Sequence, residues 1–302
     1  MLHSRMLRYL DEVARRGSIR RAAEQLNVAS SSINRQIIEL EAEIGAPLFE
    51  RLPRRMRLTS VGEVLISHVR RTLRDHEKAR HQILELEGVG RGSIRIATMN
   101  GLASGLIPRL CVEFERRHPG VRFEVLSLLG PEILRAVSEG EVDFGLGYNM
   151  ADAADLRVVN RFDVRLGVIM RPDHPLASQP TVRLSDCMGI PLALSDTSMS
   201  IRRYIDKAAQ RAGLALDVYY TTNSIEMMKF IVSKSGGLSI MSAPDIAEEK
   251  RRGVLEFRRL TDRYISRGDL RLVERATGPM GPSARAFMEV LQETLALYSE
   301  SD

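Results

Sequence analysis

The sequence has 302 residues, a formal net charge of +5, 44% hydrophobic residues and 27% charged residues. This length suits two or three domains, and the composition is that of a globular chain rather than a disordered one. No apolar run approaches the ~20 residues of a membrane-spanning helix, and the charged residues within 1–16 exclude a signal peptide, so we expect a cytoplasmic protein that contacts no membrane. Cys111 and Cys187 have apolar neighbours, which predicts reduced core thiols, with a redox role as the lesser alternative.

Positive charge is concentrated near the start of the chain. Residues 1–61 hold eleven arginines against seven acidic residues. Within them, four arginines fall in a run of seven residues that contains no acidic residue: Arg51, Arg54, Arg55 and Arg57. Such a stripe is typical of a phosphate-binding surface, and the alternative is an ordinary solvated loop.

Three helices are predicted in the first 44 residues. Apolar spacing predicts a first helix that ends at Gly17, a second over 20–26 and a third over 29–44. Ser18 is expected to cap the second helix, and Asn27 to end it in the left-handed conformation. The buried stripe of the third helix is predicted to contain Ile33, Ile37, Leu40 and Ile44.

The second and third helices are predicted to form a helix-turn-helix whose third helix enters the major groove of DNA. Its leading end is polar and contains Ser30, Ser31, Ser32, Asn34, Arg35 and Gln36. Arginine can read guanine, the two amides can read adenine, and hydroxyl groups suit phosphates. The serines have an alternative role as helix caps. Residues 47–59 alternate apolar and basic side chains around Pro53, which predicts two short strands and a turn that form a wing.

Residues 18–62 closely resemble the DNA-binding domain of LysR-type transcriptional regulators. The resemblance is carried by Ser18 with Ala22-Ala23, Leu26-x-Val28, Arg35-Gln36-Ile37, Leu40-Glu41, Leu48-Phe49-Glu50-Arg51 and Leu58-Thr59-x-x-Gly62. It implies a winged helix-turn-helix over 1–60 that binds double-stranded DNA. The chain departs from the family at Ala29-Ser30, where Ser-Gln is frequent, and at Asn34, where Ser is frequent, so no relative's operator sequence is carried over.

A long helix is predicted to follow the wing. Ser60-x-x-Glu63 fits a capping box, and apolar residues recur to about residue 87. A helix of about 27 residues would span ~40 Å, which is more than a small domain needs for its own core. A partner helix from a second protomer would explain this length, and the alternative is packing on the helix's own winged domain. The resemblance implies a dimer through this linker, 61–88, before a glycine-containing hinge at 89–92.

The remainder of the chain repeats one α/β pattern. In 94–148 and again in 190–243, strands and helices follow in the order βαβαβ. The predicted elements of the first unit are 94–98, 103–117, 121–128, 131–139 and 142–147. Those of the second are 190–194, 201–212, 215–221, 225–233 and 238–242. The resemblance implies a periplasmic-binding-protein-like effector domain, with lobe I in 93–163 and 267–302 and lobe II in 164–266, and with Asp173-His-Pro-Leu176 and 236–240 as landmarks. A strand at 270–273 and a helix at 283–297 would complete lobe I.

The first strand of each lobe ends in small polar residues just before a helix. Ligands of open α/β sheets bind beyond such strand ends, although ordinary helix capping would use the same residues. The residues carried over from the family to an effector cleft are Thr98, Asn100, Ser127, Ser198, Ser200, Arg202 and Asn223, and the predicted set also contains Met99 and Met199, which lie near the same loops. Arg202 would bind a carboxylate effector or form a structural ion pair. Met99 and Met199 would line the pocket or pack within their lobes.

These patterns favour a sequence-specific transcriptional regulator whose activity depends on a small-molecule effector. Nucleophile-elbow, zinc-ligand, Cys-x-x-Cys and P-loop spacings are missing from the sequence, so we expect neither an enzyme nor a metal or cofactor. A DNA-architectural protein with an unused sensor domain is the remaining rival. Expected partners are an interrupted inverted repeat in DNA, a second protomer and, by family likeness, a tetramer that changes access for RNA polymerase.

Overall fold

The computed structural model describes residues 5–52, 55–86, 92–263, 265, 268–278 and 280–300. The chain divides into two compact units, one with residues 1–90 and 139–141 and the other with 91–138 and 142–302. Within the described ranges, every helix is too short or too polar to cross a membrane.

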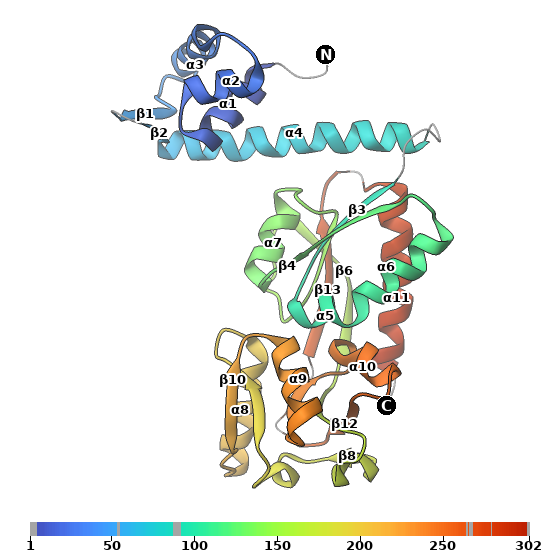
Figure 1. Cartoon of the computed structure of the whole chain (residues 1–302). Helices are drawn as coiled ribbons and strands as arrows, with labels where there is room; N and C mark the ends of the chain where they lie inside the picture. The colour runs from blue at the N-terminus through green and yellow to red at the C-terminus, as the bar shows by residue number, and fades with distance from the viewer. Residues whose placement is uncertain are drawn as a thin grey trace. The chain divides into compact units, whose positions relative to one another are not determined.

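The first unit is a winged helix-turn-helix followed by a long helix (Figure 1). Its elements are α1 Arg5–Arg16, α2 Ile19–Leu26, α3 Ser30–Ile44, β1 Phe49–Leu52, β2 Arg55–Leu58 and α4 Ser60–Leu86. The two strands pair antiparallel as the predicted wing. The predicted helix ends are confirmed: Gly17 has φ +61°, the Ser18 Oγ accepts a hydrogen bond from the Arg21 amide, and Asn27 has φ 54°.

The buried stripe of α3 is shorter than the sequence predicts. Ile33 and Ile37 are fully buried among α1, α2 and α4. Leu40 is only half-buried, and the predicted burial of Ile44 is wrong because 39% of this residue is exposed. Ile44 is not part of the core cluster that contains Ile33 and Ile37.

The start of α4 is fixed to the wing by Thr59 rather than by the predicted Ser60 capping box. The Thr59 Oγ1 accepts a hydrogen bond from the Gly62 amide at 3.0 Å and donates one to the Pro47 carbonyl at 2.7 Å. Ser60 is already the first residue of the helix, which is why it does not cap it. Farther along α4, Ile66 and Val69 are buried in the core of the winged domain. Gly90, in the predicted hinge, lies outside the described residues.

The first lobe of the second unit is a five-stranded sheet in the order β4-β3-β5-β13-β6. Its strands are β3 Ser93–Thr98, β4 Arg122–Ser127, β5 Phe144–Tyr148, β6 Leu156–Val164 and β13 Gly268–Arg275. Its helices are α5 Asn100–Ser104, α6 Leu106–Arg117, α7 Gly130–Ser138 and α11 Pro282–Glu300. α6 and α11 pack on one face and α7 on the other (Figure 1). The sheet is therefore buried on both faces.

The second lobe repeats this arrangement. A pair β10-β9 and a four-stranded sheet β11-β7-β12-β8 are linked by one parallel bridge between Leu192 and Leu238. The strands are β7 Leu166–Met170, β8 Thr181–Val182, β9 Leu192–Ser195, β10 Val218–Thr222, β11 Ser239–Ser242 and β12 Glu256–Leu260. The helices are α8 Ser200–Ala212, α9 Ile225–Ser235 and α10 Ala247–Arg251, with the short 3₁₀ helices η1 Pro175–Ser178, η2 Leu184–Cys187 and η3 Ala243–Ile246. The chain crosses between the lobes at Arg165, between β6 and β7.

The predicted helix over 103–117 is wrong in one respect, because Gly105 divides it into α5 and α6. A side chain at Gly105 would place its Cβ 2.6 Å from the carbonyl oxygen of Pro244 in the second lobe. The break therefore lets the first lobe approach the second closely.

Candidate functional site

The leading end of α3 is exposed and polar. Ser30, Ser31, Ser32 and Arg35 are exposed. The helix cap is Ala29, whose side chain makes no capping hydrogen bond, so the alternative that the serines serve as the N-cap is wrong. Their hydroxyl groups and the first amides of α3 are left facing outward, as contacts with DNA require.

The next residues of α3 connect the helix to the wing. The Arg51 Nη2 donates a hydrogen bond to the Asn34 Oδ1 at 3.1 Å, which joins β1 to α3. The Arg35 Nε donates to the Glu39 Oε1 at 2.7 Å, and this contact raises the pKa of the guanidinium. Gln36 is half-buried, and its Oε1 is a buried acceptor without a donor among the described groups. Asn34 and Gln36 are thus less exposed than the sequence suggests.

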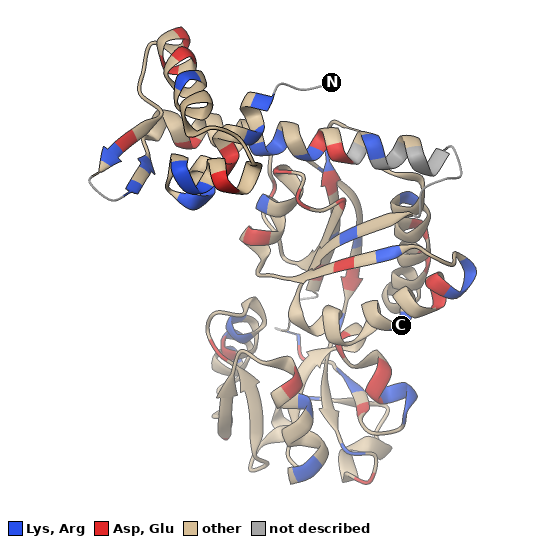
Figure 2. Ribbon diagram, turned by 45° about the horizontal axis from the view of Figure 1, so that its top comes forward, with Lys and Arg blue, Asp and Glu red and all other residues tan. Residues whose placement is uncertain are grey.

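The wing presents arginines on both strands (Figure 2). Arg51, Arg55 and Arg57 are exposed, and Arg57 lies opposite Glu50 in the antiparallel register. Arg54, the fourth predicted residue of the stripe, lies outside the described residues. Of the described arginines of the wing, Arg51 contacts α3 through Asn34, whereas Arg55 lies with the arginines at the start of α2.

A second basic cluster combines the predicted Arg55 with three arginines that were not among the predicted site residues. Arg16, Arg20, Arg21 and Arg55 line an open cavity of about 490 Å³ at the start of α2, beside Ser18. Arg20 is paired with Glu24 at 3.1 Å. Arginines at a helix N-terminus favour a phosphate, and the Arg20-Arg21 pair directly after the capping serine was the signal in the sequence.

In the second unit, two buried hydroxyl groups occupy equivalent strand ends. Thr98 ends β3 and pairs with Ser127 at the end of β4. Ser195 ends β9 and pairs with Thr222 at the end of β10. Thr98 and Ser195 are 0% and 3% exposed, and both hydroxyl oxygens lack a hydrogen-bond partner within the described part of the chain. Ser195 was missing from the predicted effector set, although it marks the same place in the second lobe as Thr98.

The other predicted residues of the first lobe differ in exposure. Met99 is half-buried, packs against the face covered by α7, and accepts a hydrogen bond on Sδ from the Tyr148 amide at 3.4 Å. Its alternative role in packing is therefore confirmed. Asn100 and Ser127 are exposed at the sheet edge.

The predicted residues of the second lobe are largely held by local contacts. The Ser198 Oγ donates to the Asp196 Oδ1 at 2.5 Å, and the hydrogen bonds from Ser198 lower the pKa of this carboxyl. The Arg202 Nε donates to the Asp206 Oδ1 at 2.8 Å, and its Nη1 donates to the Ser195 carbonyl at 2.9 Å. Arg202 thus forms the structural ion pair that was the alternative. Met199 and Ser200 are half-buried, and Asn223 is exposed just after β10.

A polar network joins the two lobes beside these residues. The Tyr148 hydroxyl contacts the Ser242 Oγ at 2.5 Å, and the Ser242 Oγ donates to the Asp245 Oδ2 at 2.5 Å. Burial raises the pKa of Asp245 to about 6, although the hydrogen bonds from Ser242 and the charge of Lys229 act in the opposite direction. The buried Lys229 donates to the Ser104 Oγ at 3.4 Å across the lobes and to the Glu249 Oε1 at 3.0 Å.

The nine predicted effector residues form two groups, one at the strand ends of each lobe. No hydrogen bond or ion pair between described residues joins one group to the other; the lobes are joined instead by the contact of Tyr148 with Ser242 and by the hydrogen bond from Lys229 to Ser104. The described residues contain no cluster of His, Cys, Asp or Glu that could hold a metal ion.

Comparisons with known proteins match both units. Residues 4–63 match the family described as "Bacterial regulatory helix-turn-helix protein, lysR family", and residues 87–296 match "LysR substrate binding domain". A RuBisCO operon transcriptional regulator of Allochromatium vinosum is 30% identical over 97% of both chains. Full-length OxyR from Pseudomonas aeruginosa has a TM-score of 0.66 at 22% identity and covers 98% of this chain and 96% of its own. CbnR, solved as a complex with its target DNA, has a TM-score of 0.65 at 19% identity and covers 96% and 99%.

Proposed function

Because this chain belongs to the LysR family of transcriptional regulators, we propose that the exposed end of α3 reads base edges while the wing binds phosphates. Both matched families are those of regulators rather than enzymes: one domain binds DNA and the other binds a small-molecule effector. The proposed division is a winged domain at 1–60, a linker at 61–88, a hinge at 89–92, lobe I at 93–163 and 267–302, and lobe II at 164–266.

The observation that carries the DNA proposal is the exposed run of Ser30, Ser31, Ser32 and Arg35 next to the arginines of the wing. Arg35 would read a guanine, while Asn34 and Gln36 would read adenines or position the helix. Phosphates would be bound by Arg51, Arg54, Arg55 and Arg57, together with the cluster of Arg16, Arg20 and Arg21.

Two substitutions separate base reading from phosphate binding, once sequencing of the bound genomic fragments has identified a site. Arg35→Ala should weaken binding to that site by about 1–3 kcal/mol and leave the affinity for unrelated DNA almost unchanged. Arg55→Ala should weaken binding to all sequences. It should also reduce by about 1 the slope of the logarithm of the binding constant against the logarithm of the salt concentration. Fluorescence anisotropy at two salt concentrations measures both, with Arg203→Ala on the exposed face of α8 as the control. Equal losses on both kinds of DNA in both variants would contradict this division of roles.

For the effector, we propose the two strand ends as the binding surface, with a carboxylate as the preferred chemistry. The polar residues of the predicted set supply hydroxyl, amide and guanidinium groups there. Ser195 adds a further hydroxyl group as a tenth residue of the surface. The unpartnered hydroxyls of Thr98 and Ser195 support this assignment because buried polar groups normally have hydrogen-bond partners. A carboxylate would compete with Asp206 for Arg202.

A thermal-shift screen of metabolite carboxylates tests this assignment. A carboxylate that raises the melting temperature of the native chain should lose this effect in Thr98→Val, in Ser195→Ala and in Arg202→Gln. Arg203→Gln, one residue farther along α8 and exposed, should keep it. A stabilising ligand that is unaffected by the first three substitutions would place the effector site elsewhere.

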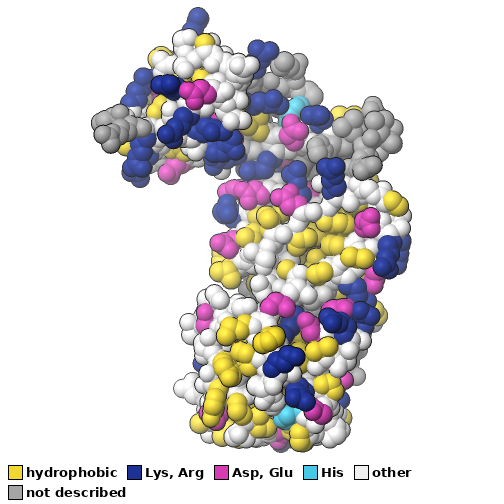
Figure 3. Space-filling view, in the orientation of Figure 1, with side chains coloured by type: hydrophobic (Ala, Val, Ile, Leu, Met, Phe, Trp, Pro, Cys, Tyr) yellow, Lys and Arg dark blue, Asp and Glu magenta, His cyan; other side chains and the backbone are white. Residues whose placement is uncertain are grey.

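We also propose a homodimer through α4 and a tetramer of two dimers, acting in the cytoplasm on an interrupted inverted repeat. α4 exposes the apolar residues Val61, Val64 and Ile83, as a helix with a missing partner does. The second lobe exposes Tyr219, Tyr220, Met227 and Phe230 on β10 and α9 (Figure 3), a surface for a second copy in the tetramer. Effector binding would then change the DNA bend and the access of RNA polymerase.

A further inference from the structure

Ile38 is an exposed isoleucine on the helix that is proposed to read DNA. It lies on α3 with 47% of its surface exposed. The core cluster of the winged domain contains Ile33 and Ile37 from the same helix but not Ile38. Packing in that core therefore does not explain why this position carries a large apolar side chain.

The direction of Ile38 on the helix places it among the residues proposed to read bases. In a helix of 3.6 residues per turn, Ile38 points about 40° from Asn34 and about 60° from Arg35, between the two. With Ser31 these residues have the spacing i, i+3, i+4, i+7, which defines one face of a helix. Residues at the same spacing on the recognition helix of a homeodomain read the major groove. Ile38 is therefore placed to reach a base edge.

The neighbouring charges favour DNA as the partner of this face. The Glu39 Oε1, next to Ile38 in the sequence, accepts a hydrogen bond from the Arg35 Nε at 2.7 Å, so its negative charge is balanced. The Asn34 Oδ1 accepts one from the Arg51 Nη2 at 3.1 Å, which joins the face to the arginines of the wing. An apolar side chain thus lies on a surface whose basic neighbours suit phosphates.

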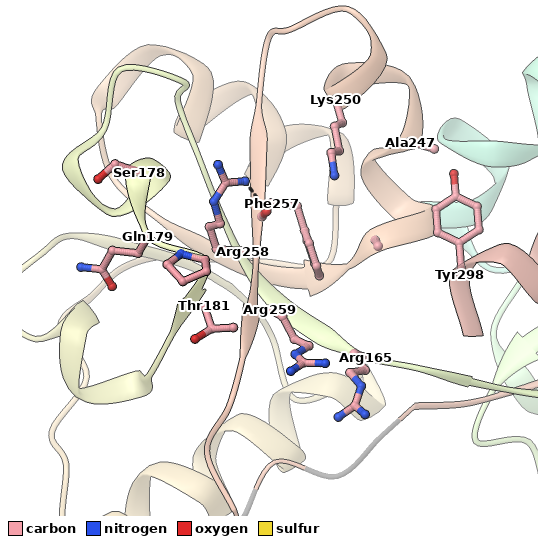
Figure 4. A pocket seen from close by; sticks show the side chains of 12 residues that line it. Arg165, Ser178, Gln179, Thr181, Ala247, Lys250, Phe257, Arg258, Arg259 and Tyr298 are labelled. Atoms are coloured by element: carbon pink, nitrogen blue, oxygen red, sulfur yellow. Dashed lines mark hydrogen bonds between the residues drawn. The ribbon is translucent and has the colours of Figure 1, made fainter. Parts of the chain in front are cut away.

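The cavity beside β12 shows the contrasting case, in which a side chain is engaged by the fold (Figure 4). There the Arg258 Nη1 donates to the Glu256 Oε2 at 2.8 Å, and its Nη2 donates to the Ala177 carbonyl. Arg258 thus holds β12 to η1, and its charge is balanced by Glu256. The exposed half of the Ile38 side chain has no comparable role and remains available to a ligand.

Thymine is the base that suits an isoleucine in the major groove. Its C5-methyl group is the apolar group that the base edges present there, whereas guanine, adenine and cytosine present hydrogen-bond donors and acceptors. An isoleucine against those groups would leave them without partners, which is unfavourable. Isoleucine in a helix also keeps mainly one χ1 rotamer, so it loses little side-chain freedom when it contacts a base.

We propose that Ile38 contacts the methyl group of a thymine and so makes the protein prefer a T·A pair at one position of each half-site. This assignment rests on the proposed role of α3 in reading base edges. Arg35 then supplies hydrogen bonds to one base, and Ile38 supplies an apolar contact to another.

Replacement of single thymines in the recognition site by uracil, which lacks only the methyl group, tests this proposal. The site is the one identified by sequencing of the bound fragments, and fluorescence anisotropy measures the affinity of each substituted duplex. Uracil at one position of a half-site should weaken binding of the native chain about fourfold. Ile38→Ala should bind the thymine and uracil duplexes equally. Ile44→Ala, at an exposed isoleucine about 120° around the same helix, should keep the fourfold preference.

Circular dichroism checks that the variants fold; if Ile38→Ala does not, Ile38→Gln replaces it with the same expectation. The proposal is overturned if no uracil substitution weakens binding of the native chain, or if every such loss persists without Ile38. In that case a lower affinity of Arg35→Ala for the site would still show that α3 reads bases. Equal affinity of the native chain for its site and for unrelated DNA would contradict the proposed function itself.

Discussion

Asp245 carries a buried carboxyl group at the contact between the lobes. Its carboxyl group lies against Gly101, accepts hydrogen bonds from Ser242, and senses the charges of Lys229 and Glu249. The pKa of Asp245 is raised from 3.8 to about 6 by burial. The folded protein therefore binds an extra proton between these pH values, and stability falls as the pH rises through this window.

Asp245→Asn should remove this dependence, because the amide stays neutral and keeps an oxygen for Ser242. We expect the melting temperature of the native chain to fall by a few degrees more between pH 4.5 and pH 7.5 than that of the variant. Differential scanning calorimetry at the two pH values measures the difference. Asp217→Asn, at an exposed aspartate, is the control. An equal loss of stability at both pH values in Asp245→Asn would show that the carboxyl acts through its shape alone.

At the scale of elements, Gly62 decides how α4 meets the wing. An added Cβ at this position would lie 2.0 Å from the carbonyl oxygen of Leu48, a backbone atom that cannot rotate away. Gly62→Ala should therefore destabilise the winged domain by about 1–3 kcal/mol and weaken DNA binding with it. Urea denaturation followed by circular dichroism measures the loss. Ser67→Ala, on the exposed face of the same helix, should change little, and a stable Gly62→Ala would disprove the close contact.

The sequence predicted most elements correctly because their signals are local. The Ser18 cap, the left-handed Asn27 and the spacing of Ile33 and Ile37 depend on neighbours in the chain. The break at Gly105 was missed because its cause, the carbonyl of Pro244, lies 139 positions away in the sequence. The same limit explains Lys229 and Asp245: nothing adjacent to them in the sequence reveals that folding brings them to the contact between the lobes.

At the scale of the whole molecule, the exposed apolar side chains of α4 bear on assembly. At 3.6 residues per turn, Val61, Val64 and Ile83 fall within an arc of about 100°. The double variant Val64→Asp/Ile83→Asp should weaken the dimer at least tenfold, as sedimentation velocity over a range of concentrations would show. Thr277→Asp, an exposed position in the second unit, is the control. An unchanged dimer would assign assembly to the effector domain instead.

Because α4 is anchored in the winged domain, its length determines the rotation of everything that follows it in the chain. Ile66 and Val69 are fixed in the same core as α3, and the helix continues without interruption to Leu86. Its phase is then set by residue count: one residue inserted after Arg71 rotates everything beyond it by about 100°, whereas four residues restore the phase to within about 40°. The preferred spacing between half-sites should follow that rotation, so the number of residues in α4 would itself specify part of the DNA sequence that the protein recognises.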